Sequence, residues 1–474
     1  MSHLILALVA TGFVLAAQTP SLAPAPAVAE VAIHPEVGAP TQQNFQGSVP
    51  VARSAGSLPL SLQDAIDRGL KNNLGILLLD SGTKMAQAQR RRALAAVLPN
   101  IGVSISENAD QLDLSIYGFR FPGVPRLVGP YEYVDARAFM AQSLFDWTAI
   151  KNHQSAVQEE KAVGLSLQDG RDLVVQAVAS AYLQIVADGA RIETTRVQVS
   201  TAEALYQRAR EQHAAGTSPA IDELRAQVQL KTRQLDLLAH VNRRNKRKLA
   251  LGRIIGLAPE QEFEPLDREP YAPLSKLTIE SALEQAYKTR ADYQSLAMQV
   301  HAAETARMAA EGERLPTLRV AGSYGAVGPN PGNSHGTFTA AASLTFNVFD
   351  GGRSHADIDQ INAVIKSRRD QLADLRGSID VQIRTAFLDL QTAAEQVTVA
   401  RENLNLAQET LDQARTRFVA GVADNVEVVQ AQDTLAGANT SAISAVLVHN
   451  LAKVSLARAI GASEITLKQY LNYK

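Results

Sequence analysis

The chain has 474 residues, of which 46% are apolar but only 5% aromatic, a composition typical of closely packed helices. Its 46 Lys and Arg against 48 Asp and Glu give a formal net charge of −2, so no overall field recruits nucleic acid or acidic ligands. The absence of cysteine excludes disulfide frameworks, thiolate metal sites, thiol catalysis and a cysteine-linked lipid anchor.

The N-terminus carries an apolar run, Leu4–Ala17, that ends in small residues. Its length and position fit the core of a signal peptide better than a membrane span. We expect a signal peptide over residues 1–29, cleaved after Ala17 or after the triplet Ala27-Val28-Ala29, and a flexible Pro- and Ala-rich leader over residues 30–57. An N-terminal anchor helix is the alternative. No later segment reaches the roughly 18 consecutive apolar residues of a membrane helix, so the sequence indicates export.

An internal repeat is the strongest pattern in the chain. The segment Ser61–Ile66 recurs as Thr278–Leu283, and further pairs recur at a nearly constant offset of about 204 to 217 residues. The further pairs are Leu98-Pro99 with Leu315-Pro316, Phe145-Asp146 with Phe349-Asp350, Ala181–Leu183 with Ala386–Leu388, and Ala215-Gly216 with Ala420-Gly421. The pattern predicts a first repeat over 58–257, a linker over 258–277, a second repeat over 278–462 and a C-terminal tail over 463–474.

Each repeat should begin with a helix and continue into two strands. Ser61 is a predicted N-cap, and Pro99 cannot continue the helix. After it, apolar and polar residues alternate with a period of two, and the second helix of this kind should run from Thr278 to about Arg314. The alternating apolar residues are Ile101, Val103 and Ile105, then Leu318, Val320 and Tyr324, then Leu344, Phe346 and Val348. Segments of about ten such residues fit lipid-facing barrel strands; half-buried hairpins of a soluble domain are the alternative. About 13 extra residues place a longer loop in the first repeat.

A very long helix follows each pair of strands. Asp146 and Asp350 are predicted N-caps, and helical patterning continues to Gly216 and Gly421, which gives helices of roughly 65–70 residues and about 100 Å. In the second repeat large and small residues alternate at heptad spacing, as required where antiparallel helices pack closely. The large residues are Leu390, Val397, Leu404, Leu411 and Phe418, and the small ones are Ala393, Ala400, Ala407 and Ala414. After the turn, a helix of about 35 residues should return. A plain coiled-coil rod would leave the strands unexplained.

Four strands are too few to close a barrel, and open strand edges cannot face lipid. Closure must therefore come from several copies, and three copies give twelve strands. The predicted fold class is mainly α with a small membrane β portion: a long α-helical barrel, plus four strands per chain that form a trimeric 12-stranded β-barrel.

In its repeat and its motifs, the chain resembles the outer-membrane efflux protein (TolC-like channel-tunnel) family over about residues 58–462. The resemblance rests on Leu60–Leu79, the two Leu-Pro-to-strand junctions, Phe349–Arg353 and Arg417–Gln432. It implies a homotrimer with a β-barrel in the cell outer membrane, in contact with its lipid, and an α-barrel in the periplasm, with 258–277 as an equatorial linker. It also implies a periplasmic adaptor (membrane-fusion) protein and an inner-membrane pump that supplies the energy. The expected function is a passive exit duct of a tripartite efflux pump or type I secretion system.

The resemblance places adaptor-docking tips and a periplasmic gate at the two turns. The turn residues are Gly216, Thr217 and Ser218 in the first repeat and Gly421, Val422 and Ala423 in the second. Glycine suits the position after a helix, Ser218-Pro219 is a predicted N-cap with Pro at the first helical position, and Asp424 is a predicted N-cap. The gate residues are Asp222, Phe418, Asp424, Glu427 and Gln430.

By position, Asp222 matches a latch aspartate of the family and Phe418 stands where a latch tyrosine does. Ala423 replaces a latch arginine, while Glu427 and Gln430 occupy two acidic-ring positions. The resemblance therefore implies a weakly latched closed state and reduced cation selectivity. Alternatively, Asp222 and Glu427 simply favour helix N-termini.

The remaining residue clusters indicate a function less strongly. Trp147, the single tryptophan, is a candidate membrane-interface anchor, with core packing as the alternative. Arg90–Arg92 could touch anionic headgroups or line a solvated turn, and Arg243–Lys248 is interpreted as a solvated face without nucleic acid. No catalytic constellation, metal-ligand spacing or phosphate loop is visible, so we expect no enzyme, metal or cofactor. The other function considered is a periplasmic coiled-coil scaffold or pump adaptor protein.

Overall fold

The computed structural model describes residues 45–53, 55–118, 123, 125–267, 271–273, 277–420, 422, 425–461 and 463–471. All of them belong to one unit, Pro40–Lys474. Within these residues the chain is mainly helical with a few strands, as the sequence predicts.

The same order of elements occurs twice: two short helices, two strands, a long helix and a returning helix. The first set is α1 (Leu62–Asn72), α2 (Leu74–Ala95), β2 (Asn100–Asp113), β3 (Leu127–Phe145), α3 (Trp147–Ala214) and α4 (Ala220–Ile255). The second set is α5 (Ile279–Thr289), α6 (Ala291–Gly312), β5 (Thr317–Gly328), β6 (His335–Thr345), α7 (Arg353–Val419) and α8 (Asn425–Ile460). The other elements are β1 (Leu58–Leu60), η2 (Leu114–Tyr117), β4 (Phe263–Pro265), η3 (Pro331–Asn333) and α9 (Ser463–Leu471).

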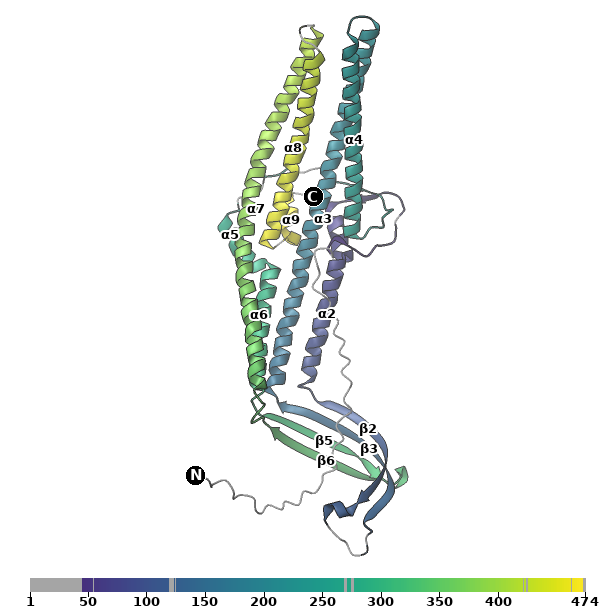
Figure 1. Ribbon diagram of the computed structural model, residues 1–474, viewed down its shortest axis with the longest axis vertical. Coiled ribbons are helices and arrows are strands. Elements are labelled where there is room, and N and C mark those ends of the chain that lie inside the picture. The colour runs from purple at the N-terminus through teal and green to yellow at the C-terminus, as the bar shows by residue number, and fades with distance from the viewer. Residues whose placement is uncertain are drawn as a thin grey trace, which may run out of the picture. The chain divides into compact units, whose positions relative to one another are not determined.

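The long helices have the predicted lengths. α3 has 68 residues and α7 has 67, and the returning helices α4 and α8 have 36 each. The turns that join α3 to α4 and α7 to α8 lie at the end of the helices opposite the strands (Figure 1). The sequence therefore predicts both the lengths and the turning points of these helices.

The short helices are broken where the sequence predicts continuity. The helix expected from Thr278 to about Arg314 is interrupted at Arg290, whose backbone is extended (ψ 116°) and whose guanidinium bonds the Asp292 carboxylate. An equivalent break lies at Asn73 (ψ 131°), whose side chain accepts from Gly75 N at 3.0 Å. Both breaks supply a start for a new helix, which the apolar periodicity does not reveal.

The short helices stack end to end beside the long ones. The side chain of Asn72, at the end of α1, donates to Ile255 O at the end of α4, so α2 continues the line of α4. Thr289 donates to Ile460 O at 2.7 Å, so α6 continues the line of α8. Near the strands the helices pack in the order α2, α3, α6, α7, and near the turns in the order α4, α3, α8, α7 (Figure 1).

The four long strands form one antiparallel sheet in the order β2-β3-β5-β6. Residues 114–126 connect β2 to β3, against residues 329–334 between β5 and β6, so the longer loop lies in the first repeat as predicted. A second pairing was not predicted: β1 and β4 run parallel, from Leu58↔Phe263 to Leu60↔Pro265. The last part of the expected leader also makes contacts, since Val49 N donates to Asn72 O and Val51 N to Gly256 O.

The apolar core has two large clusters, of which the one around α3 lies where the two sets of helices meet. One cluster centres on α3 and includes the fully buried Tyr182, and another joins α5, α7 and α8 around Ile379 and Ile383. α3 and α8 each contain a stretch apolar and long enough to cross a membrane, but 56% and 61% of those stretches are buried against other parts of the chain. Burial of this extent is typical of core helices.

Candidate functional site

The sheet has one apolar face. Rows of directly paired residues are apolar across all four strands, because the register brings the alternating apolar positions into line. One such row is Val103, Ala138, Tyr324 and Phe338, in which Val103, Tyr324 and Phe338 are 73%, 71% and 77% exposed. A broad apolar surface that the chain leaves uncovered fits contact with lipid.

The opposite face of the sheet is mainly polar or small. Arg137 and Asp135, two residues apart on β3, form an ion pair on this face, with 2.7 Å between Nε and Oδ1. Ser323 and Thr339, paired across β5 and β6, share a hydrogen bond of 2.7 Å. The sheet therefore has the two unlike faces required of a wall between lipid and water.

The helices meet the strands at a polar junction. Asp146 is the N-cap of α3, as predicted, and accepts from Ala149 N at 2.8 Å. The expected N-cap role of Asp350 is wrong, because α7 begins at Arg353 after Gly352. Asp350 nevertheless accepts from Gly352 N and Ser354 N, and the hydrogen bond from the Ser354 hydroxyl, with these two, lowers its pKa to about 2. A cavity of about 510 Å³ lies between these carboxylates.

Trp147 begins α3 at the same junction. Its ring lies against the end of α6, where a Cβ on Gly312 would stand 2.5 Å from Trp147 Cδ1, so only glycine fits. Lys151 Nζ lies 4.7 Å from the ring centroid. Trp147 therefore packs against α6, as the alternative interpretation expects. Its role as a membrane-interface anchor stays a prediction.

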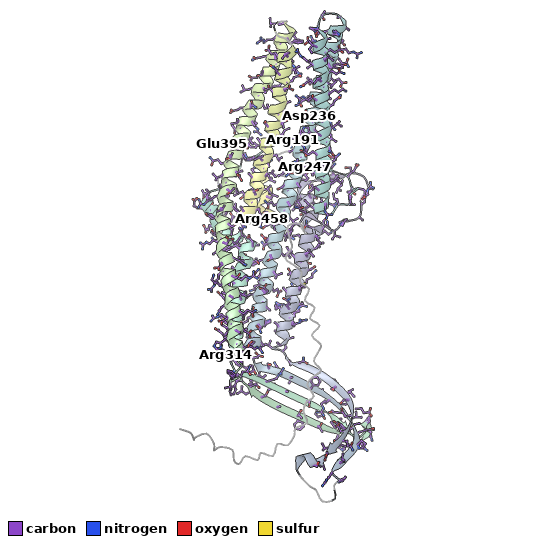
Figure 2. All side chains as sticks on the ribbon, in the orientation of Figure 1. Arg191, Asp236, Arg247, Arg314, Glu395 and Arg458 are labelled. Carbon is purple, nitrogen blue, oxygen red and sulfur yellow. The ribbon has the colours of Figure 1, made fainter. Side chains whose placement is uncertain are left out.

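Ion pairs tie the long helix to its neighbours midway along the helices. The fully buried Asp188 of α3 contacts Arg191 at 3.0 Å and Arg247 of α4 at 2.7 Å. Arg458 lies near the end of α8 (Figure 2). It contacts Asp169 of α3 at 2.6 Å. Part of the basic run Arg243–Lys248 is therefore engaged in ion pairs, including Lys248 with Glu264 at 2.8 Å.

A buried basic pair lies beside α9. Lys453 Nζ donates to Ala272 O and, at 2.9 Å, to Tyr470 O, and burial lowers its pKa to about 8. His449 packs its ring 5.2 Å from that of Tyr271. Burial, aided by the charge of Lys453, lowers the pKa of His449 to about 4. Both groups act in holding the linker and α9 against α8.

The first turn is closed by the hydrogen bonds that often end helices. Gly216 has φ 71°, Gly216 N donates to His213 O at 2.9 Å, and Thr217 N donates to Gln212 O at 2.9 Å. In the second turn Val422 N donates to Arg417 O at 3.0 Å, the equivalent of the Thr217 bond. Gly421, Ala423 and Asp424 lie outside the described residues. The predicted N-cap Ser218 is wrong, because Pro219 takes that position without a side-chain bond.

The remaining gate candidates lie near the turns but in separate contacts. Asp222 accepts from Ser218 Oγ at 3.0 Å and contacts Arg225 within its own helix. The Phe418 ring packs in a small apolar cluster, with the guanidinium of Arg208 5.8 Å from its centroid. Glu427 lies 3.5 Å from Arg417.

Gln430 lines a groove of about 400 Å³ between α4 and α8, together with apolar residues such as Leu224 and Val426. Sequence reasoning missed the contact that links the two hairpins above this groove. Arg233 and Gln229 of α4 both bond the carboxylate of Asp433 on α8, with 2.5 Å from Gln229. No signal in the sequence identifies these residues as partners. Within the ranges that the structure describes, no group of three His, Cys, Asp or Glu is arranged to hold a metal ion.

Known proteins share this architecture. The family model of the outer membrane efflux protein matches residues 65–257 and 282–462. A curated relative, the pyoverdine export outer membrane protein OpmQ of Pseudomonas aeruginosa, is 22% identical over 84% of this chain and 85% of its own.

Solved structures agree in fold. The outer membrane protein VceC of Vibrio cholerae has a TM-score of 0.71 at 17% identity and covers 84% of this chain and 96% of its own. The CmeC outer membrane channel of Campylobacter jejuni has a TM-score of 0.72 at 15% identity and covers 89% and 92%. The matched segments together span most of the chain, and so the chain belongs to the outer membrane efflux protein family and is an outer-membrane exit duct for efflux that extends into the periplasm.

Proposed function

We propose that three copies of the chain form the duct, as a closed β-barrel in the outer membrane continued by a closed helical barrel in the periplasm. The duct is passive: it carries no catalysis, and an inner-membrane pump reached through a periplasmic adaptor supplies the energy. Members of the family work in such tripartite assemblies. A periplasmic scaffold or adaptor would have no use for the exposed apolar face of the sheet.

The observation that carries this proposal is that, among the residues the structure describes, the sheet and the helices are open at the same two edges. One edge consists of β2, α2 and α4, and the other of β6 and α7. β2 and β6 end the four-stranded sheet, and unpaired strand edges are not tolerated in lipid. Joining the first edge of one copy to the second edge of the next would close the strands and the helices together.

Exposed aliphatic residues on the edge helices support the same closure. Leu235 and Leu238 of α4 are 66% and 67% exposed, and Leu388 and Leu406 of α7 are 66% and 62% exposed. Their spacing follows the heptad pattern by which neighbouring helices pack. A second copy would cover these residues and remove their apolar surface from water.

The periplasmic end of this duct is formed by the two turns. In the proposal Gly216, Thr217 and Ser218, with Gly421, Val422 and Ala423, dock the adaptor. Asp222, Phe418, Asp424, Glu427 and Gln430 line the entrance of the duct. The helix end near Asp222 and the ion pair of Glu427 with Arg417 support a polar entrance there.

Photocrosslinking tests the closure. A photoreactive residue at Ala341, on the edge strand β6, should link to a second chain, because nothing in its own chain lies beyond that edge within the described sheet. The matched control is Ala321 on β5, which pairs with Ala341 on one side and Ala141 on the other. We expect covalent dimers and trimers from position 341 in outer membranes, and crosslinks within one chain from position 321. Equal yields of linked chains, or none from either, would reject the trimer.

A further inference from the structure

Arg319 is a charged residue on the polar face of the sheet, near the end of β5 that joins the helices. It pairs with Ser143 of β3 on one side and with Ser343 of β6 on the other. The neighbouring residues on its own strand, Leu318 and Val320, point to the opposite, apolar face. The guanidinium is exposed and stands between two short hydroxyl side chains that carry no charge.

The carboxylates at the junction between the strands and the helices have other partners. Asp146 and Asp350 bond the first N–H groups of α3 and α7, where the helix ends carry partial positive charge. Glu313 faces Arg353 at 4.0 Å. Farther along the same face, Arg137 forms an ion pair with Asp135. Among the described residues, Arg319 is in none of the ion pairs of this face.

We propose that Arg319, contributed once by each of three copies, forms a cationic ring at the periplasmic end of the barrel lumen that concentrates anionic solutes for exit. The proposal rests on the trimeric barrel proposed above, in which the polar face lines the lumen. Rings of arginine or lysine select anions and phosphates in other pores. The solutes favoured would be those bearing carboxylate, phosphate or sulfonate groups.

The reach of such a ring depends on salt. A twelve-stranded barrel is wider than the eight-stranded barrels that side chains fill, so the three charges act across water. The Debye length is about 30 Å at 0.01 M salt and about 3 Å at 1 M salt. The ring should therefore act on the whole lumen at low salt and only on its own surroundings at high salt.

Current block by pyrophosphate tests the ring. Purified full-length trimers in planar bilayers would receive pyrophosphate on the barrel side at about 0.01 M salt. We expect Arg319→Gln to raise the half-blocking concentration by about tenfold, the lower end of the enrichment that a charged cleft provides. Arg319→Lys should keep the block, and about 1 M salt should weaken it in the unaltered protein.

The matched control is the double variant Asp135→Asn with Arg137→Gln, which removes a lumenal arginine together with its carboxylate and should leave the block unchanged. Equal block of Arg319→Gln and the unaltered protein would overturn the proposal, as would loss of block in the double variant alone. Absence of trimers and of conductance in the unaltered protein would instead count against the trimeric barrel itself, which separates the two failures.

Discussion

Arg233 on α4 contacts the carboxylate of Asp433 on α8, and thereby ties one helical hairpin to the other near the turns. Arg233 also contacts Asp236 at 3.2 Å, and Gln229 adds a bond to the same Asp433 carboxylate. In the proposed duct, widening this end would separate the two hairpins. The contact would then oppose opening.

Asp433→Asn should increase the open fraction of the channel. The Asp433 side chain is half exposed, so the ion pair contributes only about 1 kcal/mol, which corresponds to a roughly fivefold change in an equilibrium. Single-channel recordings in planar bilayers would show the increased open fraction as longer or more frequent open periods. Asp380→Asn, which breaks an exposed pair with Arg384 within α7, is the matched control. Identical recordings for both variants would show that the hairpins are not held at Asp433.

The two faces of the sheet can be separated with single cysteines, since the chain has none of its own. Val103 and Ser104 are adjacent on β2 but belong to opposite faces. In intact outer membranes Ser104→Cys should react with a charged, water-soluble thiol reagent, and Val103→Cys should react only with a lipid-soluble one. Detergent-unfolded protein gives the control for full reactivity. Equal labelling of both positions by the charged reagent would exclude a lipid-facing Val103.

Glu427→Gln should reduce the preference of the channel for cations. The change removes one negative charge per chain from the proposed entrance and leaves Arg417 without the carboxylate at 3.5 Å. The reversal potential in a salt gradient is the measurement, and Glu395→Gln, further along α7 from the turn, is the control (Figure 2). An unchanged reversal potential in Glu427→Gln would remove Glu427 from the entrance.

Tyr182→Phe should destabilise the folded chain. The single proton of the buried hydroxyl is shared between Leu60 O at 2.9 Å and Asp267 Oδ2 at 2.7 Å, which joins α3 to β1 and to the segment after β4. Leu266 N and Leu62 N still donate to these two oxygens, so the expected loss is that of one hydrogen bond, about 0.5–1.5 kcal/mol. Thermal unfolding followed by circular dichroism would show a lower Tm, whereas Tyr206→Phe, a half-exposed position on the same helix, should leave it unchanged. A Tm equal to that of the unaltered chain would mean that water replaces the lost donor.

His449 should make the helical part less stable in acid. Burial lowers its pKa from 6.5 to about 4, so the unfolded chain binds a proton more readily than the folded chain between these values. The folding stability that depends on neutral His449 is fully present above pH 6.5 and is lost as the pH falls toward 4. The difference between the two pKa values corresponds to ~3 kcal/mol in the free energy of unfolding per chain.

Denaturant unfolding at pH about 7.5 and about 5 would measure this loss. His449→Phe keeps a ring against Tyr271 but cannot take up a proton, so its stability should fall less between the two pH values. If both proteins lose the same stability, the acid sensitivity comes from other groups, such as His240, whose pKa is also lowered by burial.

The regular parts of this fold were predictable because they repeat. Heptad spacing around Leu390 on α7, and alternation around Val103 on β2, are properties of single segments and need no knowledge of the tertiary structure. The breaks at Asn73 and Arg290 were missed, since each depends on one residue leaving the helical conformation. Asp350 was given the wrong position because two glycines with positive φ follow it and delay the start of α7.

The contacts between hairpins were beyond prediction for a different reason. Arg233 and Asp433 are 200 residues apart, and their meeting depends on how α4 and α8 flank α3. Likewise, the sequence alone shows that Arg319 lies on the polar face of a strand, but only the register places Ser143 and Ser343 beside it.

α3 serves both halves of the chain. Its beginning is bonded to α6, where Thr148 donates to Ala309 O and Ser155 to Ala302 O, and its end packs on α4. A chain whose first repeat folds before the second would therefore hold a helix with one surface bare. That surface stays uncovered until α6 packs on it, which makes this the stage of folding at which chaperones would have most to shield.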